Sequence, residues 1–392
     1  MVPVSDSVDP KGRLGRWMPV ARSGARAFIP PTLPPQPAVD LGPLQNRLDR
    51  ANQALGRWDG VSSVLPDRRA FLYMYIRKEA VLSSQIEGTQ SSLSDLLRHE
   101  SHTAPGVPLD DVEEVSTYVA ALEHGLDRIR SGFPLSLRLI RECHEILLST
   151  GRGATKAPGQ FRQSQNWIGG ATLDTALFVP PPANSVPDLL SDLEKFVHAG
   201  HPEIPQLVRA GLIHVQFETI HPFLDGNGRI GRLLITLYLC ALGVLKEPTL
   251  YLSLFFKTQR SMYYDLLQKV RMRGDWESWL SFFLEGVEST SNQATEAAQK
   301  IVALFAKDRQ KIEQLGRVAS SVLRLHELLQ QRPLITVAVA NRALDLSPPT
   351  IRVSAQHLVA LGILSEVPGR GRSRLYVYDS YLGILSEGTE PL

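Results

Sequence analysis

The chain has 392 residues, of which 43% are hydrophobic and 21% charged, and this length predicts two or three domains. The composition is typical of a folded protein with a sizeable core and excludes wholesale disorder. Lysine and arginine number 42 against 40 acidic residues, a formal net charge of +2. That near-balance argues against a protein that coats nucleic acid or anionic membrane by bulk charge, but it allows a local anion site.

Cysteine usage and the N-terminal residues favour a cytoplasmic protein. Cys143 and Cys240 lie far apart in the sequence, so we expect no disulfide framework, and a reducing compartment fits. The chain does not open with a basic segment followed by an apolar run, so no signal peptide is predicted. The longest apolar stretch, 233–245, is too short to span a bilayer, and we expect no membrane contact.

Residues 1–43 contain nine of the 27 prolines. Proline fixes φ and removes a backbone donor, so this arm should be extended and either lie along a folded body or be loose. From residue 44 onward helical periodicity dominates. The pattern predicts helices at 44–56, 68–98, 110–131, 135–149, 186–199, 205–220, 229–243, 251–257, 260–272, 275–288 and 289–314.

Two segments interrupt the helical pattern. Residues 167–179 read as a short hairpin closed by three prolines. After residue 316, three helices (318–330, 336–344 and 350–361) precede a second hairpin, 363–367 against 374–378. This order is typical of a winged helix-turn-helix. The helix from Thr350 would expose Arg352, and the wing would carry Arg370, Arg372 and Arg374. Contact with DNA and contact with protein are equally weighted interpretations of this segment.

The chemically informative stretch runs from His221 through Pro-Phe-Leu-Asp-Gly-Asn-Gly-Arg-Ile-Gly to Arg232. Its glycines fit a G-x-G-x-x-G string, but a dinucleotide site requires strands that alternate with helices, and the chain shows no such alternation. No P-loop lysine follows at the required spacing. His144-Glu145 does not complete a zinc-protease motif, because the second histidine position is Leu148.

Physical chemistry already predicts a phosphate site here. Gly226 and Gly228 lead into a helix N-terminus, where backbone N–H groups form an anion cradle. Arg229 and Arg232 stand three residues apart, so both guanidinium groups can reach one polyanion. Asp225 supplies a hard oxygen for Mg²⁺, and His221 is suited to general-base work near neutral pH. Such a site would activate and transfer part of a nucleoside triphosphate.

The stretch resembles the Fic family signature, H-P-F-x-(D/E)-G-N-G-R-x-x-R, at every fixed position. Further family-like segments are 158–162, 178–181, 214–218, 260–264 and 274–276, so the resemblance covers roughly residues 20–290. It implies a mainly α fold, a helical bundle with one β-hairpin flap. It also implies transfer of AMP from ATP to a hydroxyl group of a target protein.

The resemblance assigns a role to each residue of the signature. His221 would deprotonate a Ser, Thr or Tyr hydroxyl, and Asp225 would hold Mg²⁺ between the α- and β-phosphates. Arg229 would neutralise the leaving group, and Arg232 would grip the γ-phosphate. Gly226, Asn227 and Gly228 would cradle the phosphates, and Gly231 would also border the nucleotide. The resemblance also counts Asn227 as catalytic, together with His221 and Arg229. Phosphoryl-type transfer depends on such positioning and charge neutralisation more than on covalent help.

Four further residues are assigned to the nucleotide or the target. Ile168 and Gly169 in the flap would border the nucleotide and pin the target as an added strand. Tyr263 and Tyr264 would line the adenine side, and an equally weighted interpretation makes them aromatic core residues.

A second motif lies upstream. Ser83-x-x-x-Glu87-Gly88 resembles the inhibitory motif (S/T)-x-x-x-E-(G/N) of Fic proteins. Glu87 falls in a predicted helix, and a glycine in a helix interior costs about 1 kcal/mol relative to alanine, which suggests close approach of another backbone at Gly88. The resemblance implies that Glu87 pairs with Arg232 and withdraws it from the γ-phosphate. In some relatives this glutamate is thought to orient water, so removal of AMP is a second expected activity.

These inferences predict an arm and inhibitory helix region at 1–104, a Fic catalytic core at 105–288, a connecting helix at 289–315 and a winged helix-turn-helix domain at 316–392. The expected function is an autoinhibited protein adenylyltransferase that uses ATP and Mg²⁺ on an unidentified target protein. Self-modification and a homodimer are further expectations. The alternative function is a DNA-binding transcriptional regulator whose Fic site is vestigial or senses nucleotide.

Overall fold

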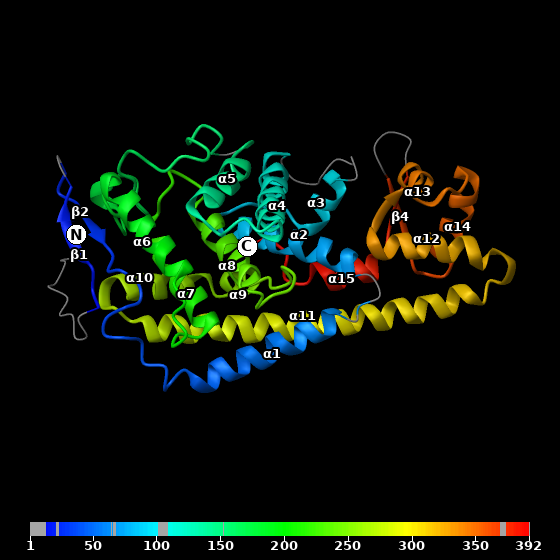
Figure 1. Ribbon diagram of the computed structural model, residues 1–392. Helices are drawn as coiled ribbons and strands as arrows, with labels where there is room; N and C mark the ends of the chain where they lie inside the picture. The colour runs from blue at the N-terminus through cyan, green and yellow to red at the C-terminus, as the bar shows by residue number, and fades with distance from the viewer. Residues whose placement is uncertain are drawn as a thin grey trace. The chain divides into compact units, whose positions relative to one another are not determined.

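The computed structural model describes residues 13–20, 23–63, 65, 68–100, 109–151, 153–368 and 374–391. The chain divides into two compact units, and Figure 1 labels most of their helices and strands. Unit 1 comprises Met1–Ala54, Thr117–Pro248 and Phe255–Ser289. Unit 2 comprises Leu55–Ser116, Thr249–Leu254 and Thr290–Leu392. Four helices contribute residues to both units: α1 (Gln45–Ser63), α4 (Leu109–Arg130), α9 (Ser253–Thr258) and α11 (Trp276–Glu313).

Unit 1 is built around a buried helix. The other α-helices and β-strands that lie wholly in it are β1 (Arg16–Pro19), β2 (Arg26–Ile29), α5 (Leu137–Leu147), α6 (Val186–His198), α8 (Asn227–Ala241) and α10 (Arg260–Arg273). The buried helix is α7 (Gln206–Ile220), in which every residue from Leu207 onward is buried. A helix that is covered all round belongs in a core, and α7 packs against α8, α6 and α10.

The helix α5 shows how local sequence sets a boundary in this unit. Its N-cap, Ser136, accepts a hydrogen bond from the Leu139 N–H, and this satisfies one of the donors that a helix start leaves open. Leu139, Cys143 and Leu147 recur at intervals of four residues and are buried. One face of α5 therefore joins the core, as the periodicity predicts.

Unit 2 combines α2 (Arg68–Ile86) and α3 (Leu93–Glu100) with the C-terminal elements. The C-terminal helices are α12 (Ala319–Gln331), α13 (Val337–Leu344), α14 (Pro348–Ala360) and α15 (Asp379–Ser386). The strands β3 (Leu334–Thr336), β4 (Ser365–Pro368) and β5 (Arg374–Val377) form an antiparallel sheet in the order β3-β5-β4. The three helices and the hairpin occur in the predicted order, whereas β3 and α15 were not predicted. The winged helix-turn-helix assignment stays a prediction.

Several predicted boundaries were wrong. The helices expected at 275–288 and 289–314 are one continuous helix, α11, because no proline or turn signal interrupts them. The helix expected at 68–98 ends at Ile86, and α3 begins at Leu93. The hairpin expected at 167–179 is reduced to one bridge, between Ile168 and Phe178, around the 3-10 turn Leu173–Thr175.

The proline-rich arm includes two strands that the sequence did not predict. β1 and β2 pair antiparallel, with Trp17 opposite Phe28. Among the described residues, no helix is both long and apolar enough to cross a membrane.

Candidate active site

The signature stretch forms a tight loop between α7 and α8. His221 adopts a left-handed backbone conformation (φ 50°, ψ 61°) and ends α7, and its N–H donates to the Phe217 carbonyl at 2.9 Å. Gly226, with φ 75°, is the N-cap of α8. A left-handed conformation costs roughly 1–2 kcal/mol for a residue with a β-carbon. Strain of this kind is typical of functional sites, and here it falls on the residue predicted to be the base.

Asn227 closes the loop from inside. Its Oδ1 accepts from the Phe223 N–H at 2.8 Å, and its Nδ2 donates to the Phe223 carbonyl at 2.9 Å. The side chain is buried. Its amide therefore determines the shape of the loop, a role that the motif comparison did not predict.

Two residues that precede the flap hold the loop from outside. Asn166 donates to the Phe223 carbonyl at 2.9 Å and to the His221 carbonyl at 3.3 Å. Arg162 donates from Nε to the His221 carbonyl at 2.9 Å and from Nη2 to the Pro181 carbonyl at 2.5 Å. Burial of this guanidinium lowers its pKa to about 10, so it remains charged near neutral pH. The base is thereby held through its own carbonyl.

His144 on α5 holds the other end of the loop. Its Nδ1 accepts from the Gly159 N–H at 2.9 Å, and its Nε2 donates to the Asp225 carbonyl at 3.0 Å. A carbonyl only accepts, so the proton of the neutral ring is on Nε2. The ring stacks on Phe223, with centroids 3.6 Å apart and planes within 5°. Burial lowers the pKa of His144 to about 4. The ring is therefore neutral near pH 7.

The charged side chains meet at the start of α8. The Asp225 carboxylate accepts from the Gly226 N–H at 2.6 Å and lies 3.8 Å from the Arg229 guanidinium. Arg229 and Arg232 are buried, with 1% and 2% of their surface exposed. Two guanidinium groups in the first turns of one helix, near its N-terminus, suit a polyphosphate.

At Gly231, α8 packs closely against α7, and His214 of α7 links this position to Tyr263 of α10. A β-carbon at Gly231 would lie 2.1 Å from Glu218 Oε1, so a larger residue there would force the Glu218 carboxylate to move. The Gly231 carbonyl accepts from His214 Nδ1, and His214 Nε2 accepts from the Tyr263 hydroxyl, both at 2.9 Å. Tyr263 is buried and packs against Phe256, whereas 39% of Tyr264 is exposed. The two tyrosines predicted to line the adenine side thus have different environments.

The flap residues are held by backbone contacts. The Ile168 N–H donates to the Phe178 carbonyl at 2.8 Å, and the Leu177 N–H donates to the Ile168 carbonyl at 3.0 Å. Gly169 has φ 68°, and a β-carbon there would meet the Leu177 side chain at 2.7 Å. Leu177 itself is 79% exposed. The flap therefore presents an apolar side chain to solvent above its glycine.

The upstream motif lies in unit 2. Ser83 is buried in α2, and Glu87 follows the last residue of that helix. The expectation that Glu87 stands in mid-helix was wrong. So was the expectation of a close backbone at Gly88, because a β-carbon there would meet nothing within 4 Å. Gly88 has φ 101°, and this left-handed conformation at the end of α2 is the physical reason for a glycine.

The remaining predicted positions are the basic residues of the C-terminal segment and the metal ligand. Arg352 is exposed on α14, and Arg374 forms an ion pair with Glu366 at 2.6 Å. Arg370 and Arg372 lie outside the described residues. Within the described ranges, no group of three or more His, Cys, Asp or Glu side chains could hold a metal ion. A single carboxylate such as Asp225 nevertheless fits Mg²⁺ that arrives with phosphates.

Comparison with known proteins matches two consecutive segments. Residues 45–127 match the Fic/DOC family N-terminal model and residues 134–239 the Fic/DOC family model. The chain is 27% identical over 280 residues to Protein adenylyltransferase Fic of Drosophila persimilis, a match that covers 70% of this chain and 51% of the relative. It is 28% identical over 269 residues to the protein of the same name from Culex quinquefasciatus, which covers 67% and 50%. The chain thus spans about half the length of these relatives.

Solved structures share the fold. A Fic family protein from Desulfovibrio desulfuricans superimposes with a TM-score of 0.58 at 20% identity, covering 87% of this chain and 97% of that one. A Fic domain containing signaling protein from Bacteroides thetaiotaomicron gives 0.52 at 20% identity, covering 64% and 96%. The expected mainly helical Fic fold is confirmed. The chain thus carries a Fic/DOC N-terminal segment followed by the Fic/DOC domain, which holds the loop and most of α8.

Proposed function

We propose that this protein is a protein adenylyltransferase that moves AMP from ATP to a Ser, Thr or Tyr hydroxyl of a target protein. The observation that carries the proposal is the loop that brings His221 and Asp225 together with the two buried guanidinium groups at the start of α8. The names of the matched relatives support the same activity.

The proposed reaction uses the loop as follows. His221 takes the proton of the target hydroxyl, and the oxygen forms a bond to the α-phosphorus of ATP. The bond from that phosphorus to the bridging oxygen breaks, and pyrophosphate leaves with the electron pair. Arg229, Arg232 and the N–H groups at the start of α8 neutralise the phosphate charge. Asp225 would hold Mg²⁺, whose charge further neutralises the phosphates when it is bound.

A labelling experiment tests this proposal. ATP labelled at the α-phosphate is incubated with the protein and a cell lysate, and labelled proteins are identified by mass spectrometry. We expect an added mass of AMP on a hydroxyl side chain, its loss in His221→Ala, and its retention in the matched control His198→Ala, an exposed residue of α6. An added phosphate, or label that survives His221→Ala, would contradict the mechanism.

Glu87 is proposed to restrain this activity. The resemblance to the inhibitory motif and the position of Glu87 beside the left-handed Gly88 support the proposal. Glu87→Gly should raise transfer about tenfold or more, because a partly buried Arg–carboxylate pair is worth about 1–3 kcal/mol. The double variant Glu87→Gly/His221→Ala should be inactive. Equal transfer by wild type and Glu87→Gly would exclude the restraint.

The C-terminal segment is proposed as a winged helix-turn-helix. Support comes from the helices α12, α13 and α14 beside a three-stranded antiparallel sheet, and from the exposed Arg352. A DNA-binding regulator would bind duplex DNA in a salt-dependent manner and lose affinity in Arg352→Ala/Arg374→Ala. Unchanged affinity would favour protein contact. The domain limits, AMP removal, self-modification, a homodimer and a cytoplasmic location stay predictions.

A further inference from the structure

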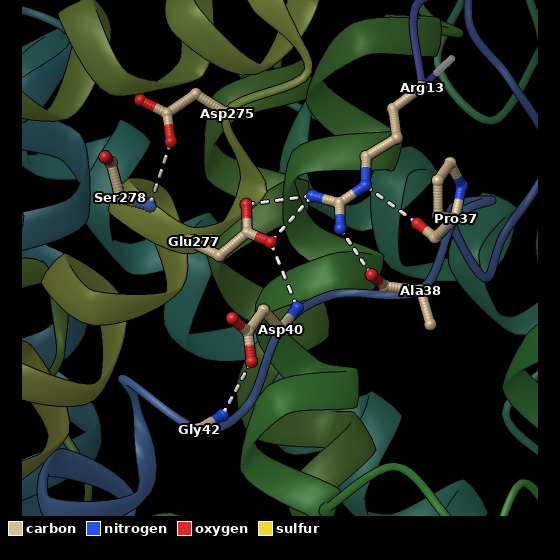
Figure 2. A network of polar contacts seen from close by, with 8 residues as sticks. All are labelled: Arg13, Pro37, Ala38, Asp40, Gly42, Asp275, Glu277 and Ser278. Atoms are coloured by element: carbon tan, nitrogen blue, oxygen red, sulfur yellow. Dashed lines mark hydrogen bonds and ion pairs between the residues drawn. The ribbon is translucent and has the colours of Figure 1, made fainter. Parts of the chain in front are cut away.

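The N-terminal arm, residues 13–20 and 23–42, is clasped to the start of α11 by one buried arginine. Arg13 is 4% exposed. Its Nη1 contacts both Glu277 carboxylate oxygens, at 2.7 and 2.9 Å, and its Nε donates to the Pro37 carbonyl at 2.7 Å. Its Nη2 donates to the Ala38 carbonyl, and the Asp40 N–H donates to Glu277 Oε1 at 3.0 Å (Figure 2). One guanidinium therefore joins both ends of the arm to α11.

Between these ends, the arm lies against the flap. The Phe28 N–H on β2 donates to the Val179 carbonyl at 2.9 Å, directly after the bridge residue Phe178. The Gly24 N–H, at the turn between β1 and β2, donates to Asp174 Oδ1 at 3.2 Å. Asp174 belongs to the 3-10 turn at the flap tip. The arm thus contacts the flap at its base and at its tip.

The side chains continue this contact. The centroid of the Phe178 ring lies 5.9 Å from that of the Phe28 ring. The Arg271 guanidinium also lies over the Phe178 ring, 4.2 Å from its centroid. Phe178 is buried and is the bridge partner of Ile168. A two-stranded ribbon is at best marginally stable on its own in water, and this flap has only one bridge in the described ranges. Its conformation therefore depends on what packs against Phe178.

The arm is also anchored at its middle, which makes it a continuous brace. Gln216 on α7 donates to the Pro31 carbonyl at 2.8 Å. A β-carbon at Gly15 would lie 2.1 Å from the Ile29 carbonyl oxygen, so the two passes of the arm touch with no room for a side chain. Because Arg13 ties the first described residue of the arm to Glu277 and to the Pro37 and Ala38 carbonyls, its loss removes the contact that joins the two ends of the arm.

We propose that the arm, acting as a brace, holds the flap in the conformation that docks the target protein. The contact between Arg13 and Glu277 is the lock, because it fixes the arm in place. The proposal rests on the proposed function in one respect, that the flap docks the target. Arg13 acts through the arm, by its contacts with Glu277 and with the Pro37 and Ala38 carbonyls, so it is a positioning residue. Its loss should weaken use of the target protein and leave reaction of ATP with water unchanged.

Hydrogen exchange tests the brace without any activity. Arg13→Ala should speed exchange of the Phe28, Ile168 and Phe178 amides by about tenfold or more. Arg47→Ala is the matched control, since its pair with Glu285, also 2.7 Å, joins α1 to α11 in an exposed position. Arg47→Ala should leave the exchange rates of these three amides unchanged. Faster exchange at Phe28 alone would show that the arm does not brace the flap, and no change at Phe28 would show that Arg13 is not the lock.

Conservative substitutions distinguish loss of the Arg13–Glu277 contact from general misfolding. Arg13→Lys retains the charge beside Glu277 but cannot also reach both arm carbonyls, and Glu277→Gln retains the carbonyl contacts and loses the charge. Both should give intermediate exchange at Ile168 and Phe178 with unchanged circular dichroism. Wild-type exchange at these two amides in both variants, or exchange raised equally across α7 and α8, would overturn the proposal.

A labelling ratio measures the consequence for transfer. In the Glu87→Gly background, α-labelled ATP is given with lysate proteins, and label on protein is compared with AMP released into water. Arg13→Ala should lower protein labelling about tenfold and change AMP release by less than about twofold. An equal fall in both would overturn the proposal. If Glu87→Gly itself labels no protein, the proposed function fails, and the exchange experiment alone decides the brace.

Discussion

His144 tests how the loop before α8 is held. His144→Ala removes the acceptor of the Gly159 N–H, the donor to the Asp225 carbonyl and the ring stacked on Phe223. A buried amide left unpaired costs about 1–3 kcal/mol, and a stacked ring pair contributes about 0.5–1.5 kcal/mol. Together, the unpaired amide and the lost ring pair should lower the free energy of unfolding by about 1.5–4.5 kcal/mol.

Two variants separate the contacts of His144. Asparagine places its oxygen near the former Nδ1, so His144→Asn should retain the Gly159 contact, whereas His144→Gln should retain the donor to Asp225. Urea unfolding and AMP transfer in the Glu87→Gly background measure both effects, and each variant should lose about half of what alanine loses. If His144→Ala unfolds at the wild-type urea concentration, or loses stability with no loss of transfer, then His144 does not set the loop.

Three further predictions concern other features. Burial lowers the pKa of His144 to about 4 and that of His214 to about 3, from the usual 6.5. The folded state favours the neutral rings, so the free energy of unfolding is highest above pH 6.5. It falls as the pH drops toward 4, by about 1.4 kcal/mol per pH unit for each histidine. His144→Asn should reduce this pH dependence in unfolding titrations, and an unchanged slope would contradict the assignment to His144. Gly88→Ala should lower the melting temperature by the equivalent of about 1–2 kcal/mol through its φ of 101°, and an unchanged melting temperature would count against the left-handed end of α2. Arg162 contacts several carbonyls through its guanidinium, and the single ammonium group of Arg162→Lys cannot replace all of these contacts. The variant should therefore lower kcat in transfer assays and leave the KM for ATP nearly unchanged. A change in KM alone would indicate a binding role.

The loop itself could be predicted because its residues are close in sequence. A glycine-rich turn before an apolar helix places His221, Asp225 and Arg229 together whatever the rest of the fold. His144, Arg162 and Asn166 could not be predicted in this way. Each is a single residue on a distant segment, and its role depends on the tertiary contacts that bring it to the backbone of the loop.

The arm and the helix ends illustrate a similar limit. Proline content predicted an extended arm, but β1 and β2 have four residues each, too few for a clear alternating pattern. At Gly88 the sequence alone could not distinguish a close backbone from a left-handed φ, since glycine serves both. The observed φ of 101° decides between them.

The contact between Glu218 and Gly231 couples two positions under substitution. With Glu218 Oε1 only 2.1 Å from where a β-carbon at 231 would stand, Gly231→Ala forces the carboxylate to move, and its damage should be relieved by the shorter Glu218→Asp. Position 231 is then not free to vary alone. A side chain in the second turn of α8 is accommodated more easily once the acid on α7 has been shortened, so one oxygen atom favours one order of the two substitutions over the other.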